Sequence, residues 1–344
     1  MTIINELEHT ITKLSAKGKG ILAADESIPT MTKRLEAVNT ESTEESRRAY
    51  RDLLITTPGI NEFIAGVILF EETLYQKTLD GTSFPEKLMQ LAILPGIKVD
   101  KGLVTLPNTS NEQTTQGLDN LAERLLEYKK KGACFAKWRA VYQITAHTPS
   151  SLAIHTNAES LARYAAICQS VGIVPIVEPE VLIDGDHTIE RCAEVSEPVL
   201  YSVFHALQRH QVKLEYIVLK PSMVISGKKC AQKATPEQVA KATLTVLKRT
   251  VPAAVPTINF LSGGQTSEEA TTHLNAMNSV SSSLPWNLSY SYARALQDYA
   301  MKMWHGDKQR ISAAQNLFYE RAKLNSLAAI GNYQPALEKK PSFA

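Results

Sequence analysis

Short apolar runs rich in Val, Ile and Leu recur along the chain, and each is followed by a polar stretch with helical periodicity. This alternation is typical of βα units that build a parallel sheet. Eight such runs occur, at residues 21–25, 63–70, 96–100, 135–142, 173–180, 216–222, 257–264 and 286–291. Eight parallel strands predict an α/β protein whose sheet closes into a (β/α)8 barrel, the TIM barrel.

The stretches between the runs carry signals for helix ends. Residues 117–132 predict a helix that Gly132 ends, and residues 235–252 predict one that begins at Thr-Pro and ends before Pro252. No linker rich in Pro, Gly or Ser divides the sequence, so we predict one barrel domain over residues 1–344. Only residues from about 331 to 344 lack a periodic pattern, and we expect this tail to be irregular and mobile.

Charge, cysteine content and the absence of targeting patterns indicate which partners and which cellular compartment to expect. With 37 basic and 35 acidic residues the net charge is +2, too small to attract nucleic acid or a membrane, and we expect neither as a partner. The four cysteines form no CxxC pair and are too few for a disulfide framework, which indicates a reducing compartment. There is no signal-peptide pattern and no apolar run of about 20 residues, so we expect a cytoplasmic protein.

Charged side chains end or interrupt five of the apolar runs. They are Asp25, Lys98, Asp100, Lys137, Arg139, Glu178, Glu180 and Lys220. Where two lie on one run they are two residues apart and point to the same face of the strand. A single pair of this kind is usually structural, whereas contributions from five strands predict a charged pocket of mixed sign at the barrel mouth.

Lys220 lies in the apolar run YIVLKPSM. An ammonium group is disfavoured there by desolvation and by the charge of a nearby Lys137. A neutral lysine amine is the group that attacks a carbonyl carbon to form a Schiff base, so this position favours imine chemistry. The alternative is a strand-end lysine whose ammonium group reaches solvent.

Two neighbouring strand ends predict a phosphate site. Ser262, Gly263 and Gly264 follow the seventh run, where glycines let an anion approach the backbone N–H groups closely. Ser291 and Arg294 follow the eighth run, and barrels often bind phosphate after strands seven and eight. Ser-Gly-Gly alone is also a common turn, so the pairing with Arg294 carries the prediction.

Ten motifs occur in one order along the chain. They are LAADES at 22–27, KR at 33–34, GIKVDKG at 96–102, TTQGLD at 114–119, FAKWR at 135–139, VPIVEPE at 174–180, DGDH at 184–187, LKPSM at 219–223, FLSGGQ at 260–265 and YARAL at 292–296. In order and approximate spacing they resemble the class I, Schiff-base-forming fructose-1,6-bisphosphate aldolases, from about residue 14 to residue 333.

The resemblance implies reversible cleavage of fructose 1,6-bisphosphate to dihydroxyacetone phosphate and glyceraldehyde 3-phosphate, in glycolysis and gluconeogenesis. It implies no metal, no cofactor and a homotetramer. Lys220 would form the Schiff base, Glu178 would act as acid and base, and Asp25 would take the proton of the 4-hydroxyl group. The remaining catalytic residues would be Lys137, Arg139 and Glu180, the 1-phosphate site Ser262, Gly263, Gly264, Ser291 and Arg294, and the 6-phosphate side Ser27, Lys98, Lys33 and Arg34.

Three departures from the family pattern affect these expectations. Animal members end in a mobile tail whose last tyrosine is implicated in proton transfer to the enamine, whereas no tyrosine follows Tyr333 here. Slower turnover, a different substrate preference, or another acid such as Glu178 would each be consistent with this. Residues 28–30 are Ile-Pro-Thr in place of Thr-Gly-Ser, and Ala293 replaces a glycine before the phosphate-binding arginine. Both changes bear on phosphate contacts.

Four other functions compete with this reading. The DGDH motif with His147 and His155 supplies residue types of a metal-dependent aldolase, although no clear ligand set emerges. A transaldolase shares the Schiff base but does not explain two phosphate sites. A non-catalytic scaffold would be expected to have lost some of the charged residues. Pyridoxal phosphate on Lys220 suits the neighbouring charged residues less well than a carbonyl substrate does.

Overall fold

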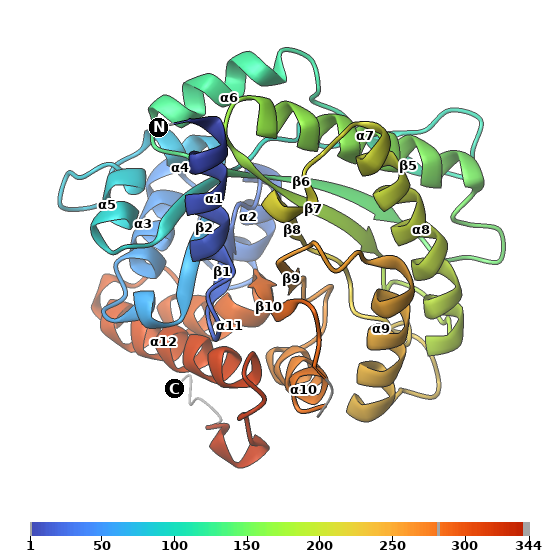
Figure 1. Ribbon diagram of the computed structural model, residues 1–344. Helices are drawn as coiled ribbons and strands as arrows, with labels where there is room; N and C mark the ends of the chain where they lie inside the picture. The colour runs from blue at the N-terminus through green and yellow to red at the C-terminus, as the bar shows by residue number, and fades with distance from the viewer. Residues whose placement is uncertain (1, 281–282, 340–344) are drawn as a thin grey trace.

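A computed structural model of the protein describes residues 2–280 and 283–339. Within these residues, eight parallel strands close into a barrel in the order β1, β10, β9, β8, β7, β6, β3, β2, with helices around it (Figure 1). The strands are β1 (Gly20–Ala24), β2 (Ile64–Leu69), β3 (Leu94–Lys98), β6 (Phe135–Tyr142), β7 (Val174–Val181), β8 (Val218–Leu219), β9 (Thr257–Phe260) and β10 (Asn287–Tyr292). The predicted single-domain (β/α)8 barrel is confirmed.

Each predicted run overlaps one barrel strand, but β8 and β9 are much shorter than their runs. β8 covers two residues of the run 216–222, because Pro221 has no backbone N–H to continue the ladder. β9 ends at Phe260, shortly before Gly263 and Gly264, whose φ angles of 54° and 85° leave the extended region. The strands therefore stop where the predicted site residues begin.

The helices fill the connections between the strands. They are α1 (Ile3–Leu14), α2 (Ile28–Glu36), α3 (Glu44–Ile55), α4 (Glu71–Tyr75), α5 (Phe84–Gln90), α6 (Leu121–Lys130), α7 (Ser151–Ser170), α8 (Ile189–Arg209), α9 (Pro236–Thr250), α10 (Ser267–Asn278), α11 (Arg294–Trp304) and α12 (Ile311–Ala328), with short 3₁₀ turns η1 (Ile60–Glu62), η2 (Leu214–Tyr216), η3 (Lys308–Arg310) and η4 (Pro335–Leu337).

The two helices predicted in detail are present, one of them shorter than predicted. α9 begins after Thr235, whose side chain forms a capping box with Gln238. α6 begins at Leu121 rather than at residue 117, because Gly117 and Asn120 have φ angles of 119° and 51° that no helix accommodates. Gly132, with a φ of 106°, follows the end of α6 as predicted.

Helix α1 covers the opening at the amino-terminal ends of the strands (Figure 1). Its Leu7, Ile11 and Leu14 pack against residues that begin the strands, among them Phe135. A Cβ atom on Gly96 would clash with the Phe135 ring, so the ring fits only because glycine stands at that position. With this end filled by apolar side chains, the opposite end remains for chemistry.

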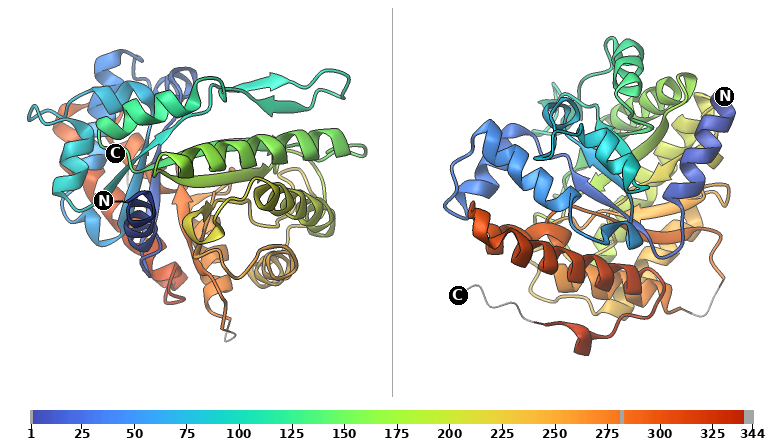
Figure 2. Two further views of the ribbon diagram at one scale, coloured as in Figure 1. Left: turned by 45° about the horizontal axis from the view of Figure 1, so that its top comes forward. Right: turned by 90° about the vertical axis from the view of Figure 1, so that its left-hand side faces the viewer.

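A two-stranded antiparallel hairpin, β4 (Leu103–Thr105) and β5 (Gln113–Thr115), follows β3 and extends away from the barrel beside α7 (Figure 2). The side-chain amide of Asn157 on α7 donates to the carbonyl of Gln113 at 2.9 Å. The hydroxyl of Thr115 donates to the carbonyl of Arg139 at 2.6 Å. The second bond ties the hairpin to the strand that carries Lys137 and Arg139.

The carboxyl-terminal segment is irregular apart from η4, and its described part is held against the barrel. Tyr333 is buried, and its hydroxyl donates to Glu338 at 2.8 Å. Glu338 also forms an ion pair at 2.8 Å with Arg321, which is buried on α12. Residues 331–339 therefore have fixed contacts, while the rest of the predicted tail, residues 340–344, lies outside the described residues.

In the part of the chain that the structure describes, no helix is both long and apolar enough to cross a membrane.

Candidate active site

A cluster of buried charges lies at the carboxyl-terminal mouth of the barrel, with Lys137 of β6 at its centre. The Nζ atom of Lys137 is 2.8 Å from Oδ2 of Asp25 and 3.4 Å from Oε2 of Glu178. Oδ2 of Asp100 lies 4.0 Å from the same Nζ atom. The Nζ atom of Lys220 is 3.2 Å from Oε1 of Glu178. Side chains from five strands or strand ends thus meet, as the sequence predicts.

These charges open into a cavity of about 770 Å³. Seven of the residues predicted from the sequence line it, and they are Asp25, Ser27, Lys98, Lys137, Arg139, Glu178 and Lys220. Asp100, Pro29, Thr30 and Ala293 line it as well. An elongated polar ligand with negative ends fits such a lining, because lysines and an arginine surround a small set of carboxylates.

Neighbouring groups of opposite charge determine the protonation states of Lys137 and Asp25. Burial alone would lower the pKa of Lys137, but the carboxylates of Asp25, Glu178 and Asp100 raise it above its ordinary value. Burial would raise the pKa of Asp25, but the Lys137 and Lys220 ammonium groups hold it below its ordinary value. At neutral pH, Lys137 is therefore a cation and Asp25 an anion.

Lys220 and Glu178 are held by backbone contacts between adjacent strands. The backbone N–H of Lys220 donates to the carbonyl of Val177 at 2.8 Å, which places Lys220 beside the residue that precedes Glu178. Both side chains are buried, each 4% exposed as a residue. Oε2 of Glu178 and Oδ2 of Asp100 are buried and have no hydrogen-bond partner among the described residues. Buried oxygens of this kind are rare in folded proteins and are concentrated at functional sites.

Two further ion pairs form among the predicted residues. Arg139 Nε donates to Glu180, and this carboxylate raises the pKa of Arg139 against the opposing effect of burial. Nζ of Lys98 lies 2.7 Å from Oδ1 of Asp100. Arg139 and Lys98 thus keep cationic groups at the cavity, while Glu180 contacts Arg139 rather than Lys220.

The predicted phosphate residues follow β9 or lie at the end of β10 and the start of α11, and β9 and β10 are adjacent strands. Ser291 Oγ is buried and has no hydrogen-bond partner in the described structure. Within residues 2–280 and 283–339 the N–H groups of Gly263 and Gly264 likewise have no acceptor. Arg294 is exposed and is the first residue of α11, an 11-residue helix whose N-terminus favours anions. None of the five residues predicted for the 1-phosphate lines the cavity that contains Lys220, and their role as a phosphate site stays a prediction.

Lys33 and Arg34 lie outside the cavity lining. Arg34 is bound by Glu26, and its second ion pair is to Asp298 at 3.4 Å. Lys33 is exposed on α2. Ser27, by contrast, lines the cavity and its hydroxyl is 3.2 Å from that of Thr30. The structure brings Ser27 and Lys98 to the site, and it does not bring the Lys33–Arg34 pair there.

The histidines and aspartates of the metal alternative are dispersed. His155 forms a hydrogen bond to the carbonyl of Ser151 at 2.7 Å on α7, and Asp184 lies 3.2 Å from Lys228. No group of three or more His, Cys, Asp or Glu side chains in the described ranges is arranged to hold a metal ion.

Sequence reasoning missed Glu26 and Lys101, although both lie inside motifs that were recognised. Glu26 lines the cavity and also binds Arg51 at 3.1 Å, a buried arginine on α3. Lys101 lines the cavity and pairs with Glu71 at 2.8 Å. Glu26 directly follows Asp25, and Lys101 directly follows Asp100, so their positions next to predicted site residues could have indicated that they lie at the cavity.

Comparison with known proteins gives a consistent result. The family model "Fructose-bisphosphate aldolase class-I" matches residues 6–343. The chain is 54% identical over 330 residues to "Fructose-bisphosphate aldolase 6, cytosolic" of Arabidopsis thaliana, covering 96% of this chain and 92% of the relative. It is 54% identical over 332 residues to a fructose-bisphosphate aldolase of Dictyostelium discoideum, covering 96% and 93%. A solved fructose-bisphosphate aldolase from Plasmodium falciparum, in complex with TRAP and a small-molecule inhibitor, has a TM-score of 0.95 and 50% identity, with 96% of each chain covered.

Proposed function

The chain belongs to the class I fructose-bisphosphate aldolase family and is a carbon–carbon lyase of glycolysis, and from this premise we propose that Lys220 forms the Schiff base with the substrate ketone. The substrates are fructose 1,6-bisphosphate in one direction, and dihydroxyacetone phosphate with glyceraldehyde 3-phosphate in the other. The observation that carries the proposal is that Nζ of the buried Lys220 lies 3.2 Å from Oε1 of Glu178, while Nζ of Lys137 lies 3.4 Å from the other oxygen of the same carboxylate.

In the first step Glu178 takes a proton from the Lys220 ammonium group, and the neutral amine attacks carbon 2. The ketone oxygen takes the proton that the attacking nitrogen loses, which gives a carbinolamine. Glu178 then transfers a proton to the departing hydroxyl group, so that water leaves and an iminium ion remains. Glu178 suits this role because its carboxylate lies within hydrogen-bond reach of Nζ of Lys220. Lys137 contacts the same carboxylate and stabilises the negative charges around the reacting carbon.

In the second step Asp25 takes the proton of the 4-hydroxyl group, and the bond between carbons 3 and 4 breaks. The two electrons of that bond move to the iminium, which becomes an enamine, while glyceraldehyde 3-phosphate leaves as the aldehyde. Asp25 is anionic at neutral pH because Lys137 and Lys220 depress its pKa despite burial, so it is ready to accept a proton. Protonation of the enamine at carbon 3 and hydrolysis release dihydroxyacetone phosphate and restore Lys220.

The two ends of a bisphosphate have separate candidate binding groups. We assign the 1-phosphate to Ser262, Gly263, Gly264, Ser291 and Arg294, where free N–H groups and a helix N-terminus are present. We assign the 6-phosphate to Ser27 and Lys98, which line the cavity, and retain Lys33 and Arg34 as a prediction from the family resemblance. Arg139, which pairs with Glu180, lines the same cavity as Ser27 and Lys98.

Assembly and location are extensions of the same proposal. We propose a homotetramer in the cytoplasm, consistent with relatives named as cytosolic and cytoplasmic isozymes. Sedimentation of the purified protein tests the tetramer.

An assay of fructose 1,6-bisphosphate cleavage tests the proposed function. We expect cleavage to be unchanged by a chelator, since every proposed step uses a protein side chain, and to be lost in Lys220→Met. Lys248→Met, an exposed lysine on α9, is the matched control and should retain full activity. Loss of cleavage with chelator, or full activity in Lys220→Met, would overturn the proposal.

A further inference from the structure

The carbonyl of Ser262 accepts two hydrogen bonds from one residue. The backbone N–H of Gln265 donates to it at 3.0 Å, and the side-chain Nε2 of Gln265 donates to it at 2.9 Å. Gln265 is buried, so neither bond is exposed to competition from bulk water. Both acceptor positions of this carbonyl are therefore used by Gln265.

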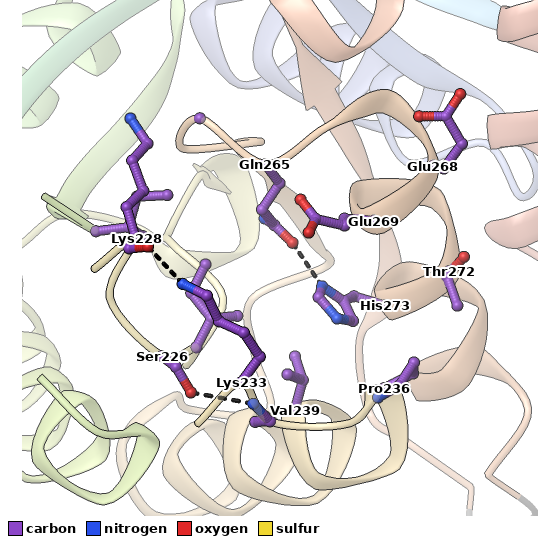
Figure 3. A pocket seen from close by; sticks show the side chains of 14 residues that line it. Ser226, Lys228, Lys233, Pro236, Val239, Gln265, Glu268, Glu269, Thr272 and His273 are labelled. Atoms are coloured by element: carbon purple, nitrogen blue, oxygen red, sulfur yellow. Dashed lines mark hydrogen bonds between the residues drawn. The ribbon is translucent and has the colours of Figure 1, made fainter. Parts of the chain in front are cut away.

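The side chain of Gln265 is in turn held by His273 of α10, toward which it points in Figure 3. Because Nε2 of Gln265 donates to a carbonyl, its Oε1 must be the atom that faces His273. Oε1 only accepts, so Nδ1 of His273 carries the proton and donates across the 2.6 Å separation. The chain of contacts from His273 to Ser262 thus has one consistent direction.

This chain of hydrogen bonds determines the direction of a phosphate donor. The carbonyl of Ser262 and the N–H of Gly263 belong to one planar, trans peptide unit, so they point in opposite directions. Holding the carbonyl toward Gln265 therefore aims the Gly263 N–H away from Gln265. That N–H group has no acceptor within the described residues.

The loop needs such support, because it is intrinsically flexible and adjoins a hollow. Gly263 and Gly264 lack side chains that could pack, and both have positive φ angles. Gly264 and Gln265 line a second cavity of about 530 Å³ between the loop after β8 and α10 (Figure 3). On the side that faces this cavity, the hydrogen bonds of Gln265, rather than side-chain packing, hold the loop in place.

We propose that Gln265 and His273 are positioning residues, which hold the Ser262–Gly263 peptide in the orientation that binds the 1-phosphate. Neither residue lines the cavity that contains Lys220. The inference rests on the proposed function, because it takes the Ser262–Gly264 loop as the 1-phosphate site. It extends the set of functional residues to α10, outside the barrel mouth.

Steady-state kinetics in the condensation direction tests this proposal. Dihydroxyacetone phosphate carries the phosphate that becomes the 1-phosphate of the product, and glyceraldehyde 3-phosphate carries the other. We expect His273→Leu and Gln265→Met to raise KM for dihydroxyacetone phosphate by about five- to tenfold, as loss of one hydrogen bond does. KM for glyceraldehyde 3-phosphate should change by less than about twofold.

Two further variants separate positioning from general damage. His273→Asn places an amide donor near the position of Nδ1 and should restore KM for dihydroxyacetone phosphate to within about twofold of the wild type. Thr272 lines the same second cavity and forms no hydrogen bond with Gln265 in the described structure, so Thr272→Val should behave as the wild type. Equal rises in both KM values, or no rescue by His273→Asn, would overturn the proposal.

Failure of this inference is distinguishable from failure of the proposed function. If the wild-type protein forms a reducible adduct with dihydroxyacetone phosphate on Lys220 but His273→Leu and Gln265→Met leave KM unchanged, only the positioning role is wrong. If the wild-type protein forms no adduct, the proposed function itself is wrong and the positioning role falls with it.

Discussion

The carboxylate of Glu178 lies between two lysines, with Oε1 3.2 Å from Nζ of Lys220 and Oε2 3.4 Å from Nζ of Lys137. The two lysines have different surroundings. Lys137 also contacts Asp25 and Asp100, so its charge is compensated by three carboxylates, whereas Glu178 is the one carboxylate that forms an ion pair with Lys220 within the described chain. This asymmetry agrees with the raised pKa of Lys137 and supports the proposal that Lys220, rather than Lys137, forms the Schiff base.

Replacing Glu178 with Gln tests its role as acid and base. Glu178→Gln keeps the shape but removes the transferable proton, so we expect kcat to fall by about 10²–10⁴-fold with a small change in KM. Steady-state cleavage of fructose 1,6-bisphosphate measures both. Glu180→Gln is the matched control, because Glu180 contacts Arg139 instead of Lys220, and its kcat should fall far less. Equal losses in the two variants would contradict the assignment.

Asp25 predicts a defined dependence of stability on pH. Its pKa in the folded protein is lowered from 3.8, since Lys137 and Lys220 outweigh the effect of burial. Such a group stabilises the folded state above its unfolded pKa, and this contribution is lost as pH falls through the folded pKa. We expect the free energy of unfolding of the wild type to exceed that of Asp25→Asn by about 2 kcal/mol from pH 7 down to about pH 5.

Urea unfolding between pH 7 and pH 3 measures this difference. It should begin to shrink as pH approaches the unfolded value of 3.8 and continue to shrink below it. A difference that instead grows as pH falls toward 3.8 would show that the pKa of Asp25 is raised, not lowered, in the folded protein.

Arg294 tests the assignment of the 1-phosphate. Arg294→Gln removes a charge at the first residue of α11, where it would form charge-assisted bonds to a phosphate. In the condensation reaction we expect KM for dihydroxyacetone phosphate to rise by about tenfold or more, with KM for glyceraldehyde 3-phosphate nearly unchanged. A selective rise for glyceraldehyde 3-phosphate would instead place Arg294 at the 6-phosphate.

The contact between Arg321 and Glu338 predicts a stability effect that is separate from catalysis. Arg321 is buried, so Glu338→Gln leaves a buried charge without its partner and should lower the free energy of unfolding by about 2 kcal/mol. Tyr333→Phe removes only the hydroxyl bond to Glu338 and should cost about 1 kcal/mol. Chemical unfolding measures both. Unchanged stability in Glu338→Gln would show that residues 331–339 are not anchored.

Much of the fold and the central cluster could be predicted from the sequence, because both follow from short-range regularities. Alternation of apolar runs with amphipathic stretches specifies the βα units, and a two-residue spacing places Lys137 and Arg139 on one strand face. The carboxyl ends of parallel strands meet at one rim, which brings Lys220 to Glu178. These arguments need no knowledge of side-chain conformations.

The parts that sequence reasoning missed depend on contacts between distant segments. Arg34 fits a phosphate ligand by charge, but no pattern shows that Glu26 binds it or that Asp298 on α11 lies beside it. Gln265 stands next to the recognised loop, yet its partner His273 lies on the following helix. Likewise the anchoring of residues 331–339 depends on Arg321, which belongs to the preceding helix α12.

Borohydride trapping tests the central claim most directly. The protein is incubated with dihydroxyacetone phosphate in the presence of a chelator, reduced, digested and examined by mass spectrometry, with Lys220→Met as the control. We predict a reduced adduct on the peptide that contains Lys220, and no adduct in Lys220→Met. An adduct on another lysine, or none while the protein still cleaves fructose 1,6-bisphosphate, would contradict the assignment of Lys220 as the Schiff-base residue.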